Sequence, residues 1–149
     1  MSALKQALFD RYNRDRRRKT LPSHSVFCVD DRNERDIASD GSLYGYFCEI
    51  FVDVANEPIV EVRMSGNLPI GPEVKAWVPK ANAVLTENPR RTLEFSVGPG
   101  EERKLIELAA AIEMIITRRY DTPSFKYVCP RTAKSLRLLA ELLQSQNQT

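Results

Sequence analysis

Residues 44–64 read YGYFCEIFVDVANEPIVEVRM, with apolar side chains at every second position on both sides of the polar segment 55–58. This period of two is typical of a strand with one buried face, because successive side chains point to opposite sides of a strand. Two such strands joined by a short polar segment predict a β-hairpin. The side chains expected on its buried face are Tyr44, Tyr46, Cys48, Ile50, Val52, Val54, Val60, Val62 and Met64.

The same pattern restricts how the two strands pair. A slip of one residue would turn Glu61 towards the buried face, so the connecting loop must contain an odd number of residues. We expect a three-residue loop, in which Glu49 faces Arg63 as an opposite-charge pair, and keep a five-residue loop as the alternative. The other pairs expected for the three-residue loop are Val52 with Val60 and Ile50 with Val62.

Before the hairpin, the sequence predicts one helix and one strand. Ser2 is a suitable N-cap for a helix that continues to about Lys19, with apolar residues at helical spacing in its first turns. Val26–Val29 forms a short apolar run that predicts a strand. The polar segment after it, as far as Ser42, is expected to be a loop.

After the hairpin, glycine and proline interrupt residues 65–89 so often that only short strands or turns are expected there. Glu73–Val78 and Ala83–Thr86 are the candidate strands, and Trp77 is expected to cover the sheet. Thr92–Val97 recovers the period of two and predicts a further strand, with Leu93, Phe95 and Val97 facing inward.

The C-terminal third predicts a helix, a strand and a second helix. Glu101 favours a helix start, and a broad apolar face continues from Leu105 towards Arg118. Phe125–Cys129 is interpreted as a short strand, and Pro130 as the first residue of the final helix. Residues 144–149 are polar and are expected to fray.

These elements predict an α+β fold, with a single-layer antiparallel or mixed sheet of about five strands and three helices on one face. The last two helices belong to a strand-helix-strand-helix unit that starts at Thr92. Residues 1–149 are expected to form a single domain, with a basic N-terminal helix over 1–19 and a frayed tail over 144–149.

Composition favours an ordinary globular protein of the cytoplasm. Hydrophobic residues make up 42% and charged residues 28% of the 149 residues, and no apolar run is long enough to predict a membrane span. The first residues lack the pattern of a secretory signal. Three widely spaced cysteines fit a reducing compartment better than a disulfide framework.

Basic charge is concentrated at the N-terminus. Residues 1–19 contain seven basic and two acidic residues, a balance of +5, whereas the remaining 130 residues have a balance of −3. Closely spaced guanidinium groups bind phosphates well, so a nucleic-acid contact is one interpretation; pairing with acidic residues of a second subunit is the other. The candidate nucleic-acid-binding residues are Arg11, Arg14, Arg16, Arg17, Arg18 and Lys19.

A second candidate surface lies on the other side of the hairpin. Phe47, Phe51 and Ile59 are apolar but fall on the polar side of the alternation, and a sheet with helices on one side would leave them exposed. We therefore expect them to contact a partner, most simply in a homo-oligomer, with another protein as a further possible partner. This favours a non-enzymatic binding or adaptor protein over a nucleic-acid-binding accessory factor.

An enzymatic function is the third hypothesis. Asp53, Glu61 and Arg63 resemble in spacing the carboxylates and the strand-borne cation of the PD-(D/E)xK nucleases, and this resemblance implies a divalent metal between carboxylates. Arg63 stands where that family has lysine, and no proline precedes Asp53. Alternating charges on a solvent-facing strand often give the same spacing, so this function ranks last.

Other chemically active side chains predict no site. Cys129, expected between a strand and a helix, lacks the arginine and glycines of a phosphatase loop, and His24 is the sole histidine. A zinc site from His24, Cys28, Cys48 and Cys129 would need ligands from separate elements without a Cys-x-x-Cys pair. We therefore expect no cofactor, no metal and no catalytic residue.

Overall fold

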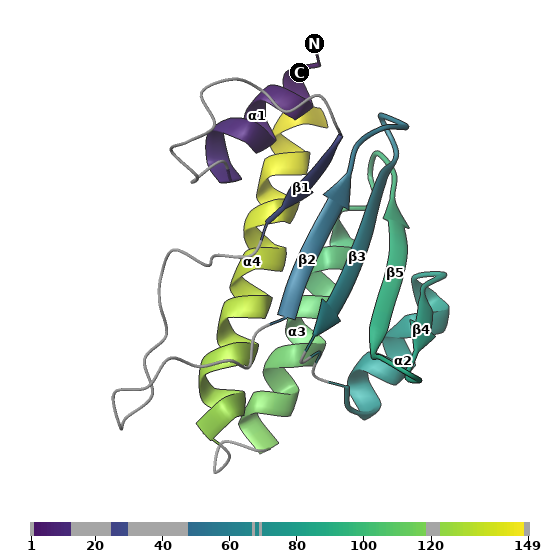
Figure 1. Cartoon of the computed structure of the whole chain (residues 1–149), viewed down its shortest axis with the longest axis vertical. Coiled ribbons are helices and arrows are strands. Elements are labelled where there is room, and N and C mark those ends of the chain that lie inside the picture. Colours follow the sequence, from purple (N-terminus) through teal and green to yellow (C-terminus); the bar gives the residue numbers. More distant parts are fainter. Residues whose placement is uncertain are drawn as a thin grey trace.

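The computed structural model describes residues 2–12, 25–29, 48–66, 68, 70–118 and 123–147, without the side chains of 116–118, 123–131 and 147. These residues form an α+β arrangement of four helices and a five-stranded antiparallel sheet with strand order β1-β2-β3-β5-β4 (Figure 1). The strands are β1 (Val26–Cys28), β2 (Cys48–Asp53), β3 (Val60–Gly66), β4 (Val84–Thr86) and β5 (Thr92–Val97). The helices are α1 (Ala3–Tyr12), α2 (Pro72–Lys80), α3 (Arg103–Arg118) and α4 (Pro123–Asn147). The predicted fold class and antiparallel sheet are confirmed, whereas the predicted number of helices was one too few.

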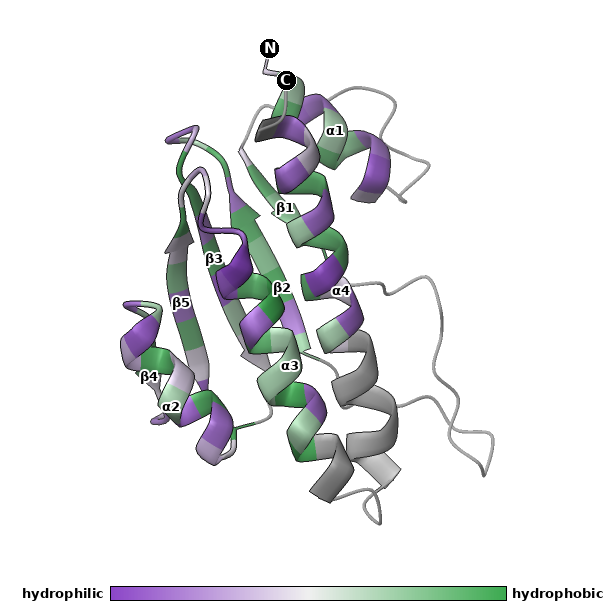
Figure 2. Ribbon diagram, turned by 180° about the vertical axis from the view of Figure 1, so that it is seen from behind, coloured by the Kyte–Doolittle hydropathy of each residue, from purple (hydrophilic) through white to green (hydrophobic). Residues whose placement is uncertain are grey.

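The described helices gather on one side of the sheet. Figure 1 looks onto the opposite side, with α3 and α4 behind the strands, and Figure 2 shows the two helices in front. The inward side chains of β2, β3 and β5 are buried in strict alternation, as the period of two predicted. They pack with the apolar faces of α2, α3 and α4 into one hydrophobic core.

The N-terminal helix is shorter in the described structure than the predicted span. Ser2 caps it as expected, because its Oγ accepts a hydrogen bond from the backbone N–H of Lys5 at 3.0 Å. Leu8 is completely buried, and α1 contacts α4 and β1. Residues 13–19, the rest of the predicted helix, lie outside the described residues.

The register of β2 and β3 places Val54 opposite Val60 and so gives a five-residue loop over 55–59; the expected three-residue loop is wrong and the alternative is confirmed. Val52 faces Val62, and Arg63 faces Phe51 instead of Glu49. Proline explains the difference, since the shorter loop would place Pro58 opposite Val54, where it has no N–H to donate to the ladder. The observed register leaves Pro58 in the loop and keeps Val54 buried.

The segment Glu73–Val78 is part of helix α2 and not a strand. Gly71 precedes the helix in an extended conformation, and Pro72 occupies its first turn, a position that tolerates the missing N–H. Val74 and Trp77, three residues apart, are both buried, as on one face of a helix. The second candidate strand is confirmed as β4, and Trp77 packs edge-on against Phe95 of the sheet at 5.0 Å between ring centroids.

The predicted strand Phe125–Cys129 is also wrong. These residues belong to α4, which begins at Pro123, so the C-terminal unit is strand-helix-helix and Pro130 lies within the helix. A short apolar run is compatible with either a strand or a buried helix, and Pro123 supplies the helix start that had been assigned to Pro130. The helix continues to Asn147, into the segment expected to fray.

No helix in the described part of the chain is both long enough and apolar enough to cross a membrane.

Candidate functional site

One side of the sheet carries none of the described helices, and we call this side the open face. It consists of the outward side chains of the five strands, which alternate with the buried ones. Its members are Val26, Cys28, Glu49, Phe51, Asp53, Glu61, Arg63, Ser65, Val84, Thr86, Thr92, Glu94 and Ser96.

A row of paired residues crosses the centre of the open face. Cys28 faces Phe51, Phe51 faces Arg63, Arg63 faces Glu94, and Glu94 faces Val84. The Arg63 guanidinium carbon lies 5.3 Å from the centroid of the Phe51 ring, which is the geometry of a cation–π contact. The row therefore presents an aromatic ring, a cation, an anion and an exposed aliphatic side chain side by side.

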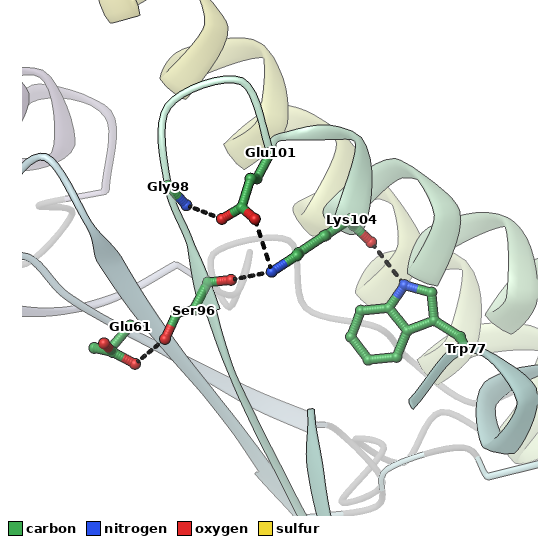
Figure 3. A network of polar contacts seen from close by, with 6 residues as sticks. All are labelled: Glu61, Trp77, Ser96, Gly98, Glu101 and Lys104. Atoms are coloured by element: carbon green, nitrogen blue, oxygen red, sulfur yellow. Dashed lines mark hydrogen bonds and ion pairs between the residues drawn. The ribbon is translucent and has the colours of Figure 1, made fainter. Parts of the chain in front are cut away.

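Two carboxylates face each other across the neighbouring row. Asp53 is the cross-strand partner of Glu61, and like charges in directly opposite positions destabilise a sheet. Both side chains are held by hydrogen bonds: Asp53 accepts from the Ser25 hydroxyl at 3.0 Å and from the Ala55 N–H at 2.9 Å. Glu61 accepts from the Ser96 hydroxyl at 2.8 Å (Figure 3). A conflict of this kind between local charge and stability is typical of functional surfaces.

We predict that Glu61→Gln raises the free energy of unfolding by about 0.2–1 kcal/mol, because it removes the repulsion by Asp53. The amide oxygen of glutamine still accepts the hydrogen bond from Ser96. Urea denaturation measures the change. Glu107→Gln is the control of opposite sign, since Glu107 pairs favourably with Arg103 at 3.1 Å and its neutralisation should destabilise slightly. An unchanged or lower stability of the Glu61 variant would contradict the repulsion.

Behind the open face, a polar network joins β5 to the start of α3 (Figure 3). The Lys104 ammonium group donates to the backbone carbonyl of Ser96 at 3.1 Å and lies 3.4 Å from the Glu101 carboxylate. The same carboxylate accepts from the backbone N–H of Gly98 at 2.8 Å. Ser96 thus connects both sides of the sheet, with its hydroxyl on Glu61 and its carbonyl on Lys104.

The Gly98 N–H bond is the main cause that lowers the pKa of Glu101 below its ordinary value; burial opposes it, and Lys104 lowers the pKa further. The charged carboxylate therefore stabilises the fold above the pKa of the unfolded chain, and this contribution is lost as pH falls through the lower folded pKa. Glu101→Gln should cost less than about 1 kcal/mol at neutral pH, because the Glu101 side chain is exposed. Urea denaturation should show the full difference from wild type above the ordinary value of 4.5 and a decreasing difference as pH falls below it. A pH-independent difference would contradict this assignment.

The predicted partner residues lie in different environments. Phe51 is half-buried on the open face, and Ile59 is 45% exposed in the β2–β3 loop. Phe47 lies outside the described residues. Of the predicted nucleic-acid-binding residues, Arg11 is exposed in the last turn of α1, and the others, Arg14, Arg16, Arg17, Arg18 and Lys19, also lie outside the described residues.

Asp53, Glu61 and Arg63, the residues considered for catalysis, lie on the same face of the sheet. Asp53 faces Glu61, and Arg63 lies in the neighbouring row over Phe51. No three or more His, Cys, Asp or Glu side chains in the described ranges are grouped to hold a metal ion. Cys28 points outward and Cys48 inward, so they lie on opposite sides of the sheet.

A groove of about 400 Å³ lies at the end of the sheet that carries the β2–β3 loop. Its walls come from α1, β3, β5 and α4, and they include the acidic residues Glu57 and Glu102. The Ser2 hydroxyl donates to the Glu57 carboxylate at 2.5 Å, which joins the start of α1 to the hairpin loop. The groove is therefore part of the attachment of the N-terminal helix.

Comparison with known proteins gives no relative: no protein-family model, no curated protein and no solved structure matches the chain.

Glu49 and Glu94 on the open face were not among the predicted partner residues, and Asp53 was not predicted to pair with Glu61. The pairing was hidden by the wrong loop length, since a three-residue loop places Asp53 opposite Ile59. The signal that would have revealed it is Pro58, which cannot take a hydrogen-bonded place in the ladder.

Proposed function

We propose that the protein is a non-enzymatic binding protein that self-associates, with the open face as its docking surface. The distribution of exposed apolar side chains carries this proposal. Four large hydrophobic side chains are exposed among the described residues, and three of them, Val26, Ile59 and Val84, belong to the open face or its connecting loop. Val26 and Val84 lie on the two edge strands and Ile59 at the hairpin loop, so exposed apolar side chains border the open face, which we take as a feature of a contact surface.

The polar groups of the open face support binding and not catalysis. Asp53 and Glu61 are occupied by hydrogen bonds from Ser25, Ala55 and Ser96, and Arg63 lies against an aromatic ring. Groups fixed in this way on a sheet are rigid recognition elements for charged partners, because their side-chain positions are already ordered before binding.

Two matched variants test the proposal. Ile59→Ser removes an apolar side chain from the docking surface, and Met114→Ser removes one of similar exposure, 53%, from α3. Burial of an isoleucine stabilises by about 1.5–3 kcal/mol, so Ile59→Ser should raise the self-association dissociation constant about ten-fold or more. Met114→Ser should leave it unchanged. Equal effects of both variants in sedimentation equilibrium would contradict the open face as the interface.

A nucleic-acid-binding accessory function is the second candidate, and the charge of +5 in residues 1–19 favours it. Affinity for a short fluorescent oligonucleotide should then fall steeply with added salt. Substitution of Arg14, Arg16 and Arg17 should weaken binding regardless of base sequence. Equal binding by the substituted and original proteins, or no binding by either, would remove this candidate.

A further inference from the structure

The charge of the open face restricts what can lie on it. Its outward side chains include four carboxylates, Glu49, Asp53, Glu61 and Glu94, and one guanidinium group, Arg63. Two copies stacked face to face would bring these carboxylates together, and like charges in an interface cost several kcal/mol. The occupant that fits this face is therefore a cationic segment.

The chain itself contains one segment of the required charge. Two long ranges lie outside the described residues, 13–24 and 30–47. Range 13–24 contains five basic residues and one acidic residue, whereas range 30–47 contains five acidic and two basic ones. Charge complementarity thus favours the first range and disfavours the second as a partner of the open face.

We propose that the basic segment of one copy, residues 11–19, binds the open face of a second copy. This inference rests on the proposed function and names the group that occupies the surface. The arginine side chains of the segment would pair with Asp53, Glu61 and Glu94, since planar guanidinium groups bind carboxylates with two hydrogen bonds. The pairing also gives a role to the facing carboxylates of Asp53 and Glu61, because a cation bound between them attracts both and offsets their mutual repulsion.

The segment and the open face are different surfaces, so copies can bind head-to-tail or exchange segments reciprocally in a pair. Arg11 is exposed at the end of α1, and α1 is fixed to the body by the buried Leu8 and by the bond from Ser2 to Glu57. Each copy therefore offers both a donor segment and an acceptor face. Head-to-tail contacts close into rings or continue as chains of copies. Any contact between the segment and the open face weakens as salt screens the charges.

A charge-swap experiment tests the pairing. The segment variant carries Arg16→Glu, Arg17→Glu and Arg18→Glu, the face variant carries Glu61→Lys and Glu94→Lys, and a combined variant carries all five changes. Sedimentation equilibrium at low ionic strength should show each separate variant associating at least about ten-fold more weakly than wild type. The combined variant, and a mixture of the two separate variants, should associate again, because opposite charges face each other in both.

Controls keep the experiment decisive. Glu141→Lys, an exposed change on α4, should leave association unchanged, and circular dichroism establishes that each variant is folded. The salt dependence of wild-type association gives a readout that needs no variant, and it should be steep.

The outcomes separate the two proposals. A weakened face variant beside an unaffected segment variant would overturn this inference and leave the open face as a docking surface for another occupant. The inference would also be overturned if both separate variants associate more weakly and association does not recover in the combined variant, since the two sets of charges would then act at different places. Two unaffected variants, or a wild type that stays monomeric at all concentrations, would overturn both proposals.

Discussion

Replacing Trp77 by alanine should lower the free energy of unfolding by about 3–5 kcal/mol, the largest loss that we expect for a single side chain. Trp77 is 4% exposed and joins three elements: it lies on α2, packs edge-on against Phe95 of β5, and donates its indole N–H to the Lys104 carbonyl of α3 at 3.1 Å (Figure 3). Alanine would remove both contacts and leave a cavity beneath the sheet. Urea denaturation monitored by far-ultraviolet circular dichroism measures the loss.

Trp77→Phe is the matched control for this prediction. Phenylalanine retains an aromatic ring against Phe95 but leaves the Lys104 carbonyl without its indole donor, which costs about 1–3 kcal/mol. The alanine variant should therefore lose clearly more stability than the phenylalanine variant. Equal losses would show that the ring packing contributes little and would contradict the predicted role of Trp77 in joining α2 to the sheet.

Leu139→Ala should lower the free energy of unfolding by about 2–5 kcal/mol. Leu139 is completely buried in α4, where Leu136, Ala140 and Leu143 continue the same buried face. Leu142→Ala provides a control of the same residue type on the same helix, because Leu142 is only half-buried and packs at the edge of the core. It should cost less than half as much. Similar losses of stability at both positions would contradict the orientation of α4 in the structure, in which Leu139 is buried and Leu142 lies at the edge of the core.

The strands were predictable because their burial is one-sided. In Cys48–Val54, Val60–Met64 and Thr92–Val97 the core requires an apolar residue at every second position, and this requirement is visible in the sequence. The long helix α3 was predictable for the same reason, with a period of 3.6 in place of two.

The missed elements are those in which local sequence permits two structures. Residues 73–78 and 125–129 are short and lack a clear period, and each lies in a helix whose start is set by a proline, Pro72 or Pro123. In the structure α2 and α4 each contact α3. Contacts between separate elements leave no mark on local periodicity.

The candidate site was only partly predictable. Alternation places Phe51 on the outer side of β2 without knowledge of the fold. Which charges become neighbours depends on the register, however, and an error of two residues in the loop separated Asp53 from Glu61 in the prediction. The acidic character of the open face therefore became visible only with the paired strands.

The most direct test of the open face as a docking surface is the molar mass of the unmodified protein in solution. Sedimentation equilibrium over roughly 1 to 100 μM, at low and at high salt, would measure it. We predict a mass that rises above the 17.0 kDa of one chain as concentration increases, and a return towards 17.0 kDa when salt is added. A constant mass of 17.0 kDa at every concentration and at low salt would contradict self-association through this face.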